Sequence, residues 1–218
     1  IEEVYSANSG HPGGALSIAD VLTVLYFNQM NINPKDPKAE GRDRFVLSKG
    51  HCSPALYSTL ARKGYFSPNE LQTFRSLCSR LQGHPSSRLL EGIEVSTGSL
   101  GQGLSVANGM ALTSKLNHDG YRVYCLLGDG ELEEGQVWEA AMTAAHYKLD
   151  NLIAFVDNNG LQIDGPTDSV MNLRDIGKKF EAFGWTVMHI DGHNAEEIEI
   201  KSDSLISSVK ITLLGCWV

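Results

Sequence analysis

Residues 123–160 read VYCLLGDGELEEGQVWEAAMTAAHYKLDNLIAFVDNNG. Val123–Leu127 and Leu152–Val156 are short apolar runs, which are typical of strands buried on both faces of a sheet. Glu134–Lys148 has a helical pattern, with acids in the first turn and Lys148 in the last. A strand, a helix and a second strand form a βαβ unit, so we expect the two strands to be parallel.

The flanking sequence continues this alternation of helices and strands. Apolar spacing, capping residues and breaks predict helices over residues 15–30, 54–63, 67–78, 103–117 and 173–183, strands over 44–47 and 186–190, and a loop over 84–99. Ser67-Pro68-Asn69-Glu70 is a capping box for the third helix, and Asn172 is a cap for the last. The sequence predicts an α/β fold with a mostly parallel sheet, helices on both faces and ligands at the carboxyl ends of its strands.

Composition and charge narrow the class of protein. The chain has 218 residues, is 42% hydrophobic and 20% charged, and carries a net charge of −8. These values are typical of a soluble globular protein and argue against nucleic-acid or anionic-membrane binding. No apolar run approaches the ~20 residues that span a bilayer. Four widely spaced cysteines predict reduced, mostly buried thiols in a cytoplasmic protein, and the absence of an initial Met predicts a trimmed chain or a fragment.

Polar residues follow both strands of the βαβ unit. The first strand ends in Gly128-Asp129-Gly130 and the second in Asp157-Asn158-Asn159-Gly160. Each motif alone is a common turn sequence, which is the alternative interpretation. Together, at adjacent strand ends around one helix, they bring hard oxygen ligands suited to Mg²⁺ or Ca²⁺ near a helix N-terminus that favours phosphate. The pair therefore predicts a metal–diphosphate site, and neither a P-loop nor a GxGxxG fingerprint is present.

Several further motifs, in order, carry a resemblance to a known family. They are Ser9-Gly10-His11-Pro12-Gly13-Gly14, Phe45 to His51 (FVLSKGH), Gly83-His84-Pro85, Ser96 to Gly103 (STGSLGQG), Gly128 to Gly135 (GDGELEEG) and Leu161 to Gly165 (LQIDG). With 27 residues between Gly130 and Asn158, the chain resembles the transketolases, which use thiamine diphosphate. The resemblance covers residues 1–198 and is nearest to the N-terminal, diphosphate-binding subunit of split transketolases.

This resemblance implies the metal and cofactor contacts. By it, Asp129, Asn159 and the carbonyl of Leu161 hold Mg²⁺ or Ca²⁺. By the same resemblance the thiamine diphosphate is contacted by residues from both halves of the chain, namely His51, Gly98, Ser99, Leu100, Gly130, Asn159 and Ile163.

The resemblance also assigns catalytic histidines. His11 and His84 match histidines that meet the substrate's hydroxyls, and histidine can shuttle protons near neutral pH. Glu134 matches a glutamate near the subunit interface, with a first-turn helix acid as the alternative. His193 is expected to begin a helix, and Glu131 is interpreted as a solvated acid.

The implied activity is the transfer of a two-carbon ketol unit from a ketose phosphate to an aldose phosphate, as in the pentose phosphate pathway. The glutamate that activates the aminopyrimidine belongs to a pyrimidine-binding domain that nothing here matches. We therefore expect a second, partner chain, a dimer or dimer of heterodimers, and an isolated chain that is inactive. Residues 1–198 form the predicted domain, and residues 199–218 an atypical tail, a shifted end or a last strand over 210–214. The alternatives are a non-catalytic paralogue that only binds a partner, and a specialised sugar-phosphate transketolase subunit.

Overall fold

The computed structural model of the chain describes residues 1–203 and 210–215. A five-stranded sheet in the order β1-β2-β3-β7-β6 runs through its centre, and every neighbouring pair is parallel. Its strands are β1 (Arg44–Leu47), β2 (Val123–Gly128), β3 (Leu152–Asp157), β6 (Thr186–Asp191) and β7 (Lys210–Gly215), while β4 (Leu161–Gln162) and β5 (Gly165–Pro166) form a small antiparallel pair. The predicted α/β fold with a parallel sheet is confirmed.

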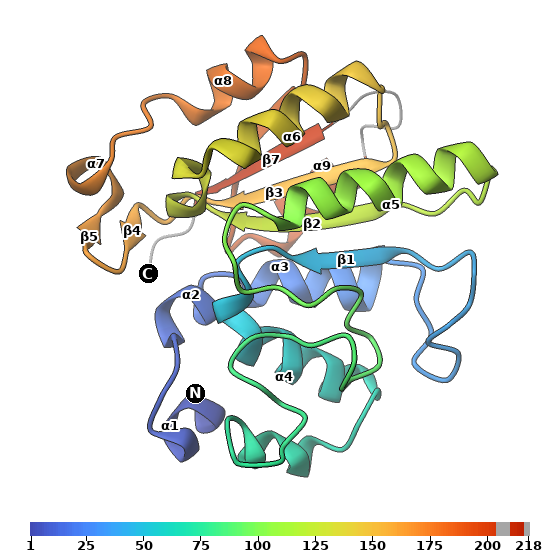
Figure 1. Cartoon of the computed structure of the whole chain (residues 1–218), viewed down its shortest axis with the longest axis vertical. Coiled ribbons are helices and arrows are strands. Elements are labelled where there is room, and N and C mark those ends of the chain that lie inside the picture. The colour runs from blue at the N-terminus through green and yellow to red at the C-terminus, as the bar shows by residue number, and fades with distance from the viewer. Residues whose placement is uncertain (204–209, 216–218) are drawn as a thin grey trace.

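Helices cover both faces of the sheet, and Figure 1 shows α5, α6 and α8 on one side and α3 and α4 on the other. The longer α-helices are α3 (Ala19–Val24), α4 (Ser53–Lys63), α5 (Gly103–Asn117), α6 (Gly135–His146), α8 (Ile176–Ala182) and α9 (Ala195–Asp203). Shorter ones are α1 (Glu2–Ala7), α2 (Pro12–Leu16) and α7 (Thr167–Val170). Single turns of 3₁₀ or π type are η1 (Leu25–Gln29), η2 (Gly50–Cys52), η3 (Pro68–Thr73) and η4 (Gly130–Glu133). No described helix has the length and apolar character needed to cross a membrane.

Strand side chains alternate between two buried cores, which explains why the strands read as continuous apolar runs. In β2, Val123, Cys125 and Leu127 join the core under α5 and α6, while Tyr124 and Leu126 join the core under α3 and α4. A strand with an apolar layer on each face has no solvent side on which a polar residue would be favoured.

Three predicted helices differ from the observed ones. In each, a polar side chain forms a hydrogen bond or ion pair that the predicted helix did not include. The helix expected over 15–30 is broken at Ser17, whose hydroxyl donates to Gly14 O (3.2 Å) and to the Asp157 carboxylate. The helix expected over 67–78 is only the turn η3, because the Glu70 carboxylate pairs with Arg80 (2.5 and 2.9 Å) instead of closing the capping box.

The helix expected from Asn172 begins later, at Ile176. Asp175 caps it by accepting from Lys178 N (2.9 Å), and Asn172 instead accepts from Arg174 N within a turn (2.7 Å).

The described residues 210–215 form β7 between β3 and β6, so the last-strand interpretation of that segment is the one observed. The division of the chain at residue 198 stays a prediction.

Candidate functional site

Asp129 ties the end of β2 to the loop after β3. It is 3% exposed, Oδ1 accepts from Gly130 N (2.8 Å), and Oδ2 accepts from Gly160 N (2.7 Å) and Thr167 Oγ1 (3.3 Å). Burial raises the pKa of Asp129, and the hydrogen bonds from Gly160 and Gly130 oppose the rise. The two motifs predicted to meet at the carboxyl edge of the sheet therefore do meet.

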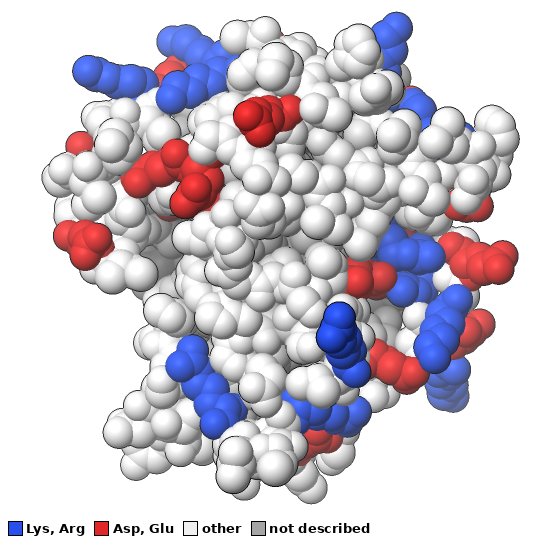
Figure 2. Space-filling view, viewed as in Figure 1, with Lys and Arg blue, Asp and Glu red and all other residues white. Residues whose placement is uncertain are grey.

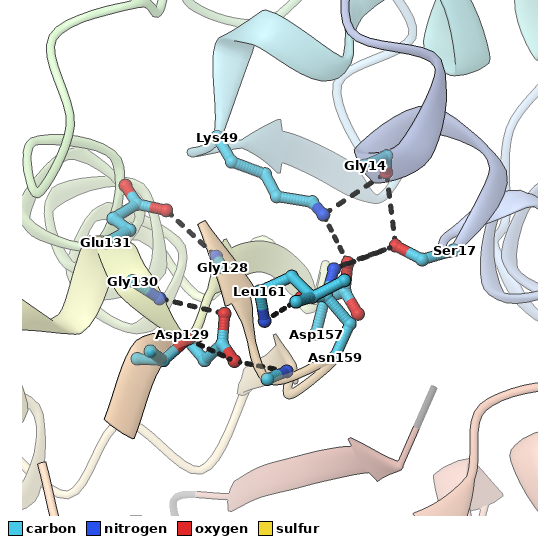
Figure 3. Close-up of polar contacts among 12 residues, drawn as sticks. Gly14, Ser17, Lys49, Gly128, Asp129, Gly130, Glu131, Asp157, Asn159 and Leu161 are labelled. Atoms are coloured by element: carbon cyan, nitrogen blue, oxygen red, sulfur yellow. Dashed lines mark hydrogen bonds and ion pairs between the residues drawn. The ribbon is translucent and has the colours of Figure 1, made fainter. Parts of the chain in front are cut away.

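Asn159 and Leu161 lie in the segment that follows β3, beside Asp129 (Figure 3). Asn159 Oδ1 accepts from Leu161 N (2.9 Å), and its Nδ2 donates to Asp157 Oδ2 (3.3 Å). Leu161 begins β4 and is half-exposed, and Ile163 is 91% exposed. The structure brings the three predicted metal ligands into one region, while Ile163 extends into solvent at the hairpin between β4 and β5.

The donor set fits a hard divalent cation. A carboxylate, an amide oxygen and a main-chain carbonyl are the oxygen types that Mg²⁺ and Ca²⁺ bind, and a carboxylate oxygen that accepts one hydrogen bond has a further lone pair. The described residues hold no cluster of three or more His, Cys, Asp or Glu able to bind a metal, so a metal here would depend on amide and carbonyl oxygens. Asp129 and Asn159 also line a cavity of about 540 Å³ bounded by Arg174 and His189.

His11, His51 and His84 come from three separate segments and lie near one another: His11 caps α2, His51 lies in η2, and His84 lies in the loop after η3. The rings of His11 and His51 meet edge to face with centroids 5.1 Å apart. His84 packs against the backbone of Gly98, where an added Cβ would lie 3.1 Å from the ring. Gly98 therefore lies beside His84, although none of the three histidines lines the cavity next to Asp129.

His51 is held in its neutral form. Burial lowers its pKa to about 4, and the charges of Lys49, His11 and His84 act in the same direction. A neutral imidazole can accept a proton or hydrogen bond at one ring nitrogen while donating from the other.

We expect the His51 ring to stay neutral between pH 5.5 and 8. Its depressed pKa contributes stability that is present above the unfolded pKa of ~6.5 and is lost as pH falls toward 4. The measurement is an NMR titration of the histidine ring protons, with His51→Gln to assign the signal. A His51 midpoint near 6.5 would contradict the expectation.

A buried ion pair lies beneath the site, and the sequence motifs gave no role to its members. Lys49 Nζ, Ser17 Oγ and Asn159 Nδ2 all donate to Asp157 Oδ2, and Lys49 and Asp157 are 3% and 0% exposed (Figure 3). Burial alone would lower the pKa of Lys49, but nearby Cys52 and Asp157 hold it above its ordinary value. The other carboxylate oxygen, Asp157 Oδ1, has no hydrogen-bond partner among the described residues. The only sequence signal is a Lys two residues after one predicted strand and an Asp directly after another.

Glu131 is buried, so its interpretation as a solvated acid was wrong. It is 3% exposed, and burial raises the pKa of its carboxyl group against hydrogen bonds from Ser48, Gly101 and Gly128. The described cysteines agree with the prediction of mostly buried thiols, since Cys52 and Cys125 are buried and Cys78 is exposed, and Cys216 lies outside the described residues. Helix α6 begins at Gly135, so Gly130 opens the short turn η4, and Glu134 is an exposed N-cap without a side-chain cap bond.

Charged side chains on the face viewed in Figure 2 are of both signs and lie mostly toward its margins. The middle of that face carries few Lys, Arg, Asp or Glu side chains. Large apolar side chains are also exposed on the protein, among them Leu16, Phe27 and Met142 at 46%, 45% and 54%.

Comparison with known sequences agrees with the geometry. The family model described as "Transketolase, thiamine diphosphate binding domain" matches residues 1–214. An apulose-4-phosphate transketolase subunit of Phocaeicola vulgatus is 50% identical over 198 residues, which are 91% of this chain and 70% of that one. The 6-deoxy-6-sulfo-D-fructose transketolase subunit SqwG of Clostridium sp. is also 50% identical, with 91% and 72% covered. Human transketolase is 46% identical over 91% of this chain and 32% of its own length.

Solved structures give the same result. A Pichia stipitis transketolase variant in complex with xylulose 5-phosphate superposes with a TM-score of 0.93 and 36% identity, over 99% of this chain and 34% of that one. Transketolase from Leishmania mexicana gives 0.92 and 33%, with the same coverage. The chain thus spans about 70% of the split subunits it resembles but only about a third of the one-chain transketolases.

Proposed function

The chain belongs to the transketolase family, as a thiamine diphosphate-binding domain, and from that premise we propose that it supplies the diphosphate- and metal-binding part of a transketolase. The observation that supports this most strongly is the junction of Asp129 with the Asn159–Gly160 loop at the carboxyl edge of the sheet. The reaction is the transfer of a two-carbon ketol unit from a ketose phosphate to an aldose phosphate.

Asp129, Asn159 and the Leu161 carbonyl would hold Mg²⁺ or Ca²⁺, which in turn would neutralise a diphosphate. Gly130, with its N–H at the start of η4, and the Gly98, Ser99 and Leu100 segment would contact the cofactor, together with His51 and Ile163. Ile163 is exposed in the chain alone, so its contact requires a cofactor or partner to cover the β4–β5 hairpin. When bound, thiamine diphosphate would supply the nucleophilic carbon and the electron sink that ketol transfer requires.

His11 and His84 would act on the substrate. Both are accessible to solvent, since His11 is half-buried and His84 is exposed. Partial desolvation by its neighbours, with the charges of Arg75 and His11, lowers the pKa of His84, which keeps its ring available to accept a proton from a sugar hydroxyl. His51, deeper and neutral, would orient groups at the cofactor without adding positive charge.

A partner subunit would complete the site. Both 50% identical relatives are named as transketolase subunits, which supports a second chain. Our proposal is that this second chain carries the pyrimidine-binding domain and that the complex is a dimer or a dimer of heterodimers. The partner would provide the glutamate that activates the aminopyrimidine ring and would cover the exposed face near Glu134. We place the complex in the cytoplasm and its reaction among pentose-phosphate conversions.

Two other functions are possible for this chain, and each can be distinguished from the first. The names of the two 50% identical relatives, one for apulose 4-phosphate and one for 6-deoxy-6-sulfo-D-fructose, favour a specialised substrate as the second candidate. A non-catalytic paralogue would bind its partner without binding cofactor.

We expect turnover only when the chain, a pyrimidine-domain subunit, thiamine diphosphate and Mg²⁺ are combined. The test is a coupled assay with a panel of ketose phosphates and aldose phosphates, with each component omitted in turn. Turnover by the chain alone would contradict the half-site proposal. Calorimetric titration of thiamine diphosphate with and without Mg²⁺ tests for the non-catalytic paralogue. A chain that binds no cofactor even with its partner present would be such a paralogue.

A further inference from the structure

Glu131 joins three segments of the chain that are distant in sequence. Its Oε1 accepts from Ser48 Oγ (2.5 Å), just after β1, and from Gly101 N (2.9 Å) in the loop before α5. Its Oε2 accepts from Gly128 N (3.1 Å) at the end of β2. Because the carboxylate is buried and its bonds are charge-assisted, each is stronger than a bond between neutral groups.

Gly101 and Gly103 in the loop at residues 97–103, and Gly50 packed against that loop, have no room for a side chain. A Cβ added at Gly50 would lie 2.8 Å from Gly98 N, and one at Gly101 (φ +80°) would lie 2.7 Å from the Cβ of Glu134. A Cβ at Gly103 would collide with Ser48. Packing alone therefore brings the loop close to β1 and α6, but these glycines supply no directional bond. The Glu131 carboxylate supplies one, at Gly101 N.

We propose that Glu131 is a positioning residue, which fastens the Gly98–Gly101 loop to the ends of β1 and β2 before any cofactor is bound. This inference rests on the proposed function in one respect, because Gly98, Ser99 and Leu100 are the segment predicted to contact the cofactor rings. With the loop fixed in advance, binding would not have to order it, which favours affinity.

A glutamine side chain at position 131 would have the size of the glutamate side chain, but it could not accept all three hydrogen bonds. Its single amide oxygen can face one group of donors, and its NH₂ would then point at the N–H of Gly128 or at the Ser48 and Gly101 donors. In either orientation at least one buried backbone N–H would lose its acceptor. The bonds that remain would also lose the charge of the carboxylate, so the bond to Gly101 N would be weaker even in the orientation that keeps it. Glu133, in the same turn, is the matched control, since its side chain accepts from Gln162 Nε2 (2.7 Å) and holds none of the three segments.

The test is amide hydrogen exchange on the full chain without cofactor, read by mass spectrometry. We expect Glu131→Gln to speed exchange in peptides covering residues 98–103 by about 10-fold or more, with residues 137–144 of α6 unchanged. Glu133→Gln should match the wild-type chain. Ser48→Ala, which removes one donor and leaves the Gly101 bond, should give a smaller increase and serves if Glu131→Gln does not fold.

Two results would overturn the proposal. One is wild-type exchange of residues 98–103 in Glu131→Gln, or in Ser48→Ala where that variant has to serve. The other is an equal acceleration in every peptide, which would mean general destabilisation rather than local positioning. Neither result depends on cofactor or turnover, so failure here is separate from failure of the transketolase proposal. If thiamine diphosphate binds the wild-type chain, Glu131→Gln should also weaken that binding.

Discussion

Replacing Asp129 by Asn is expected to weaken Mg²⁺-dependent binding of thiamine diphosphate by about 100-fold or more. Asp129 is the only carboxylate in the proposed ligand set, and its two oxygens also accept from Gly130 N and Gly160 N. An Asn side chain would lose the negative charge and direct its NH₂ at one of these N–H donors, so the metal ligand and the loop that carries Asn159 would be affected together. The measurement is calorimetric titration of cofactor at saturating Mg²⁺, on the chain alone and with a pyrimidine-domain partner.

Two matched variants separate the causes. Asp119→Asn removes a carboxylate at an exposed position and should bind cofactor as the wild type does. Thr167→Val removes the 3.3 Å hydrogen bond to Asp129 Oδ2 but keeps the carboxylate, so we expect a much smaller loss. If Asp129→Asn kept its Mg²⁺-dependent affinity within about threefold of wild type, Asp129 would not be a ligand, and the assignment of the metal site would be wrong.

Replacing Lys49 by Met is expected to destabilise the fold by about 3–5 kcal/mol. The ammonium group is the only basic side chain paired with Asp157 among the described residues, and both side chains are almost fully buried. Without Lys49, the carboxylate would remain in a site where water cannot compensate its charge, and only Ser17 and Asn159 would still donate to it. The measurement is the free energy of unfolding from urea denaturation.

A surface pair provides the control. Lys115 pairs with Asp150 (2.7 Å) with both side chains about a third or more exposed, and Lys115→Met should cost only about 0–1 kcal/mol. The double variant Lys49→Met with Asp157→Asn should recover a large part of the loss, because the uncompensated charge is gone. Equal costs for Lys49→Met and Lys115→Met would show that the buried pair does not contribute to stability in the way its burial implies.

Features encoded in short stretches could be predicted from the sequence. The βαβ unit at 123–160 was predicted because strands buried on both faces require apolar residues at every position, and helix α5 was predicted with its observed bounds. The meeting of Asp129 with the loop after Val156 followed from one topological rule, that parallel neighbours present their carboxyl ends at one edge. The grouping of His11, His51 and His84 needed the family resemblance, since they come from loops whose packing no local pattern encodes.

The tertiary contacts alone revealed which charged residues are buried. Lys49 and Asp157 are 108 residues apart, Ser17 and Asp157 are 140 apart, and β2 separates β1 from β3 in the sheet. Glu131 follows a turn motif, but its buried carboxylate accepts from Gly101 N, 30 residues away in the chain. The place of β7 between β3 and β6 is likewise a long-range property. Local sequence sets which residues form strands and helices, but desolvation of a charge depends on every segment that covers it, so it is fixed only when the chain has folded.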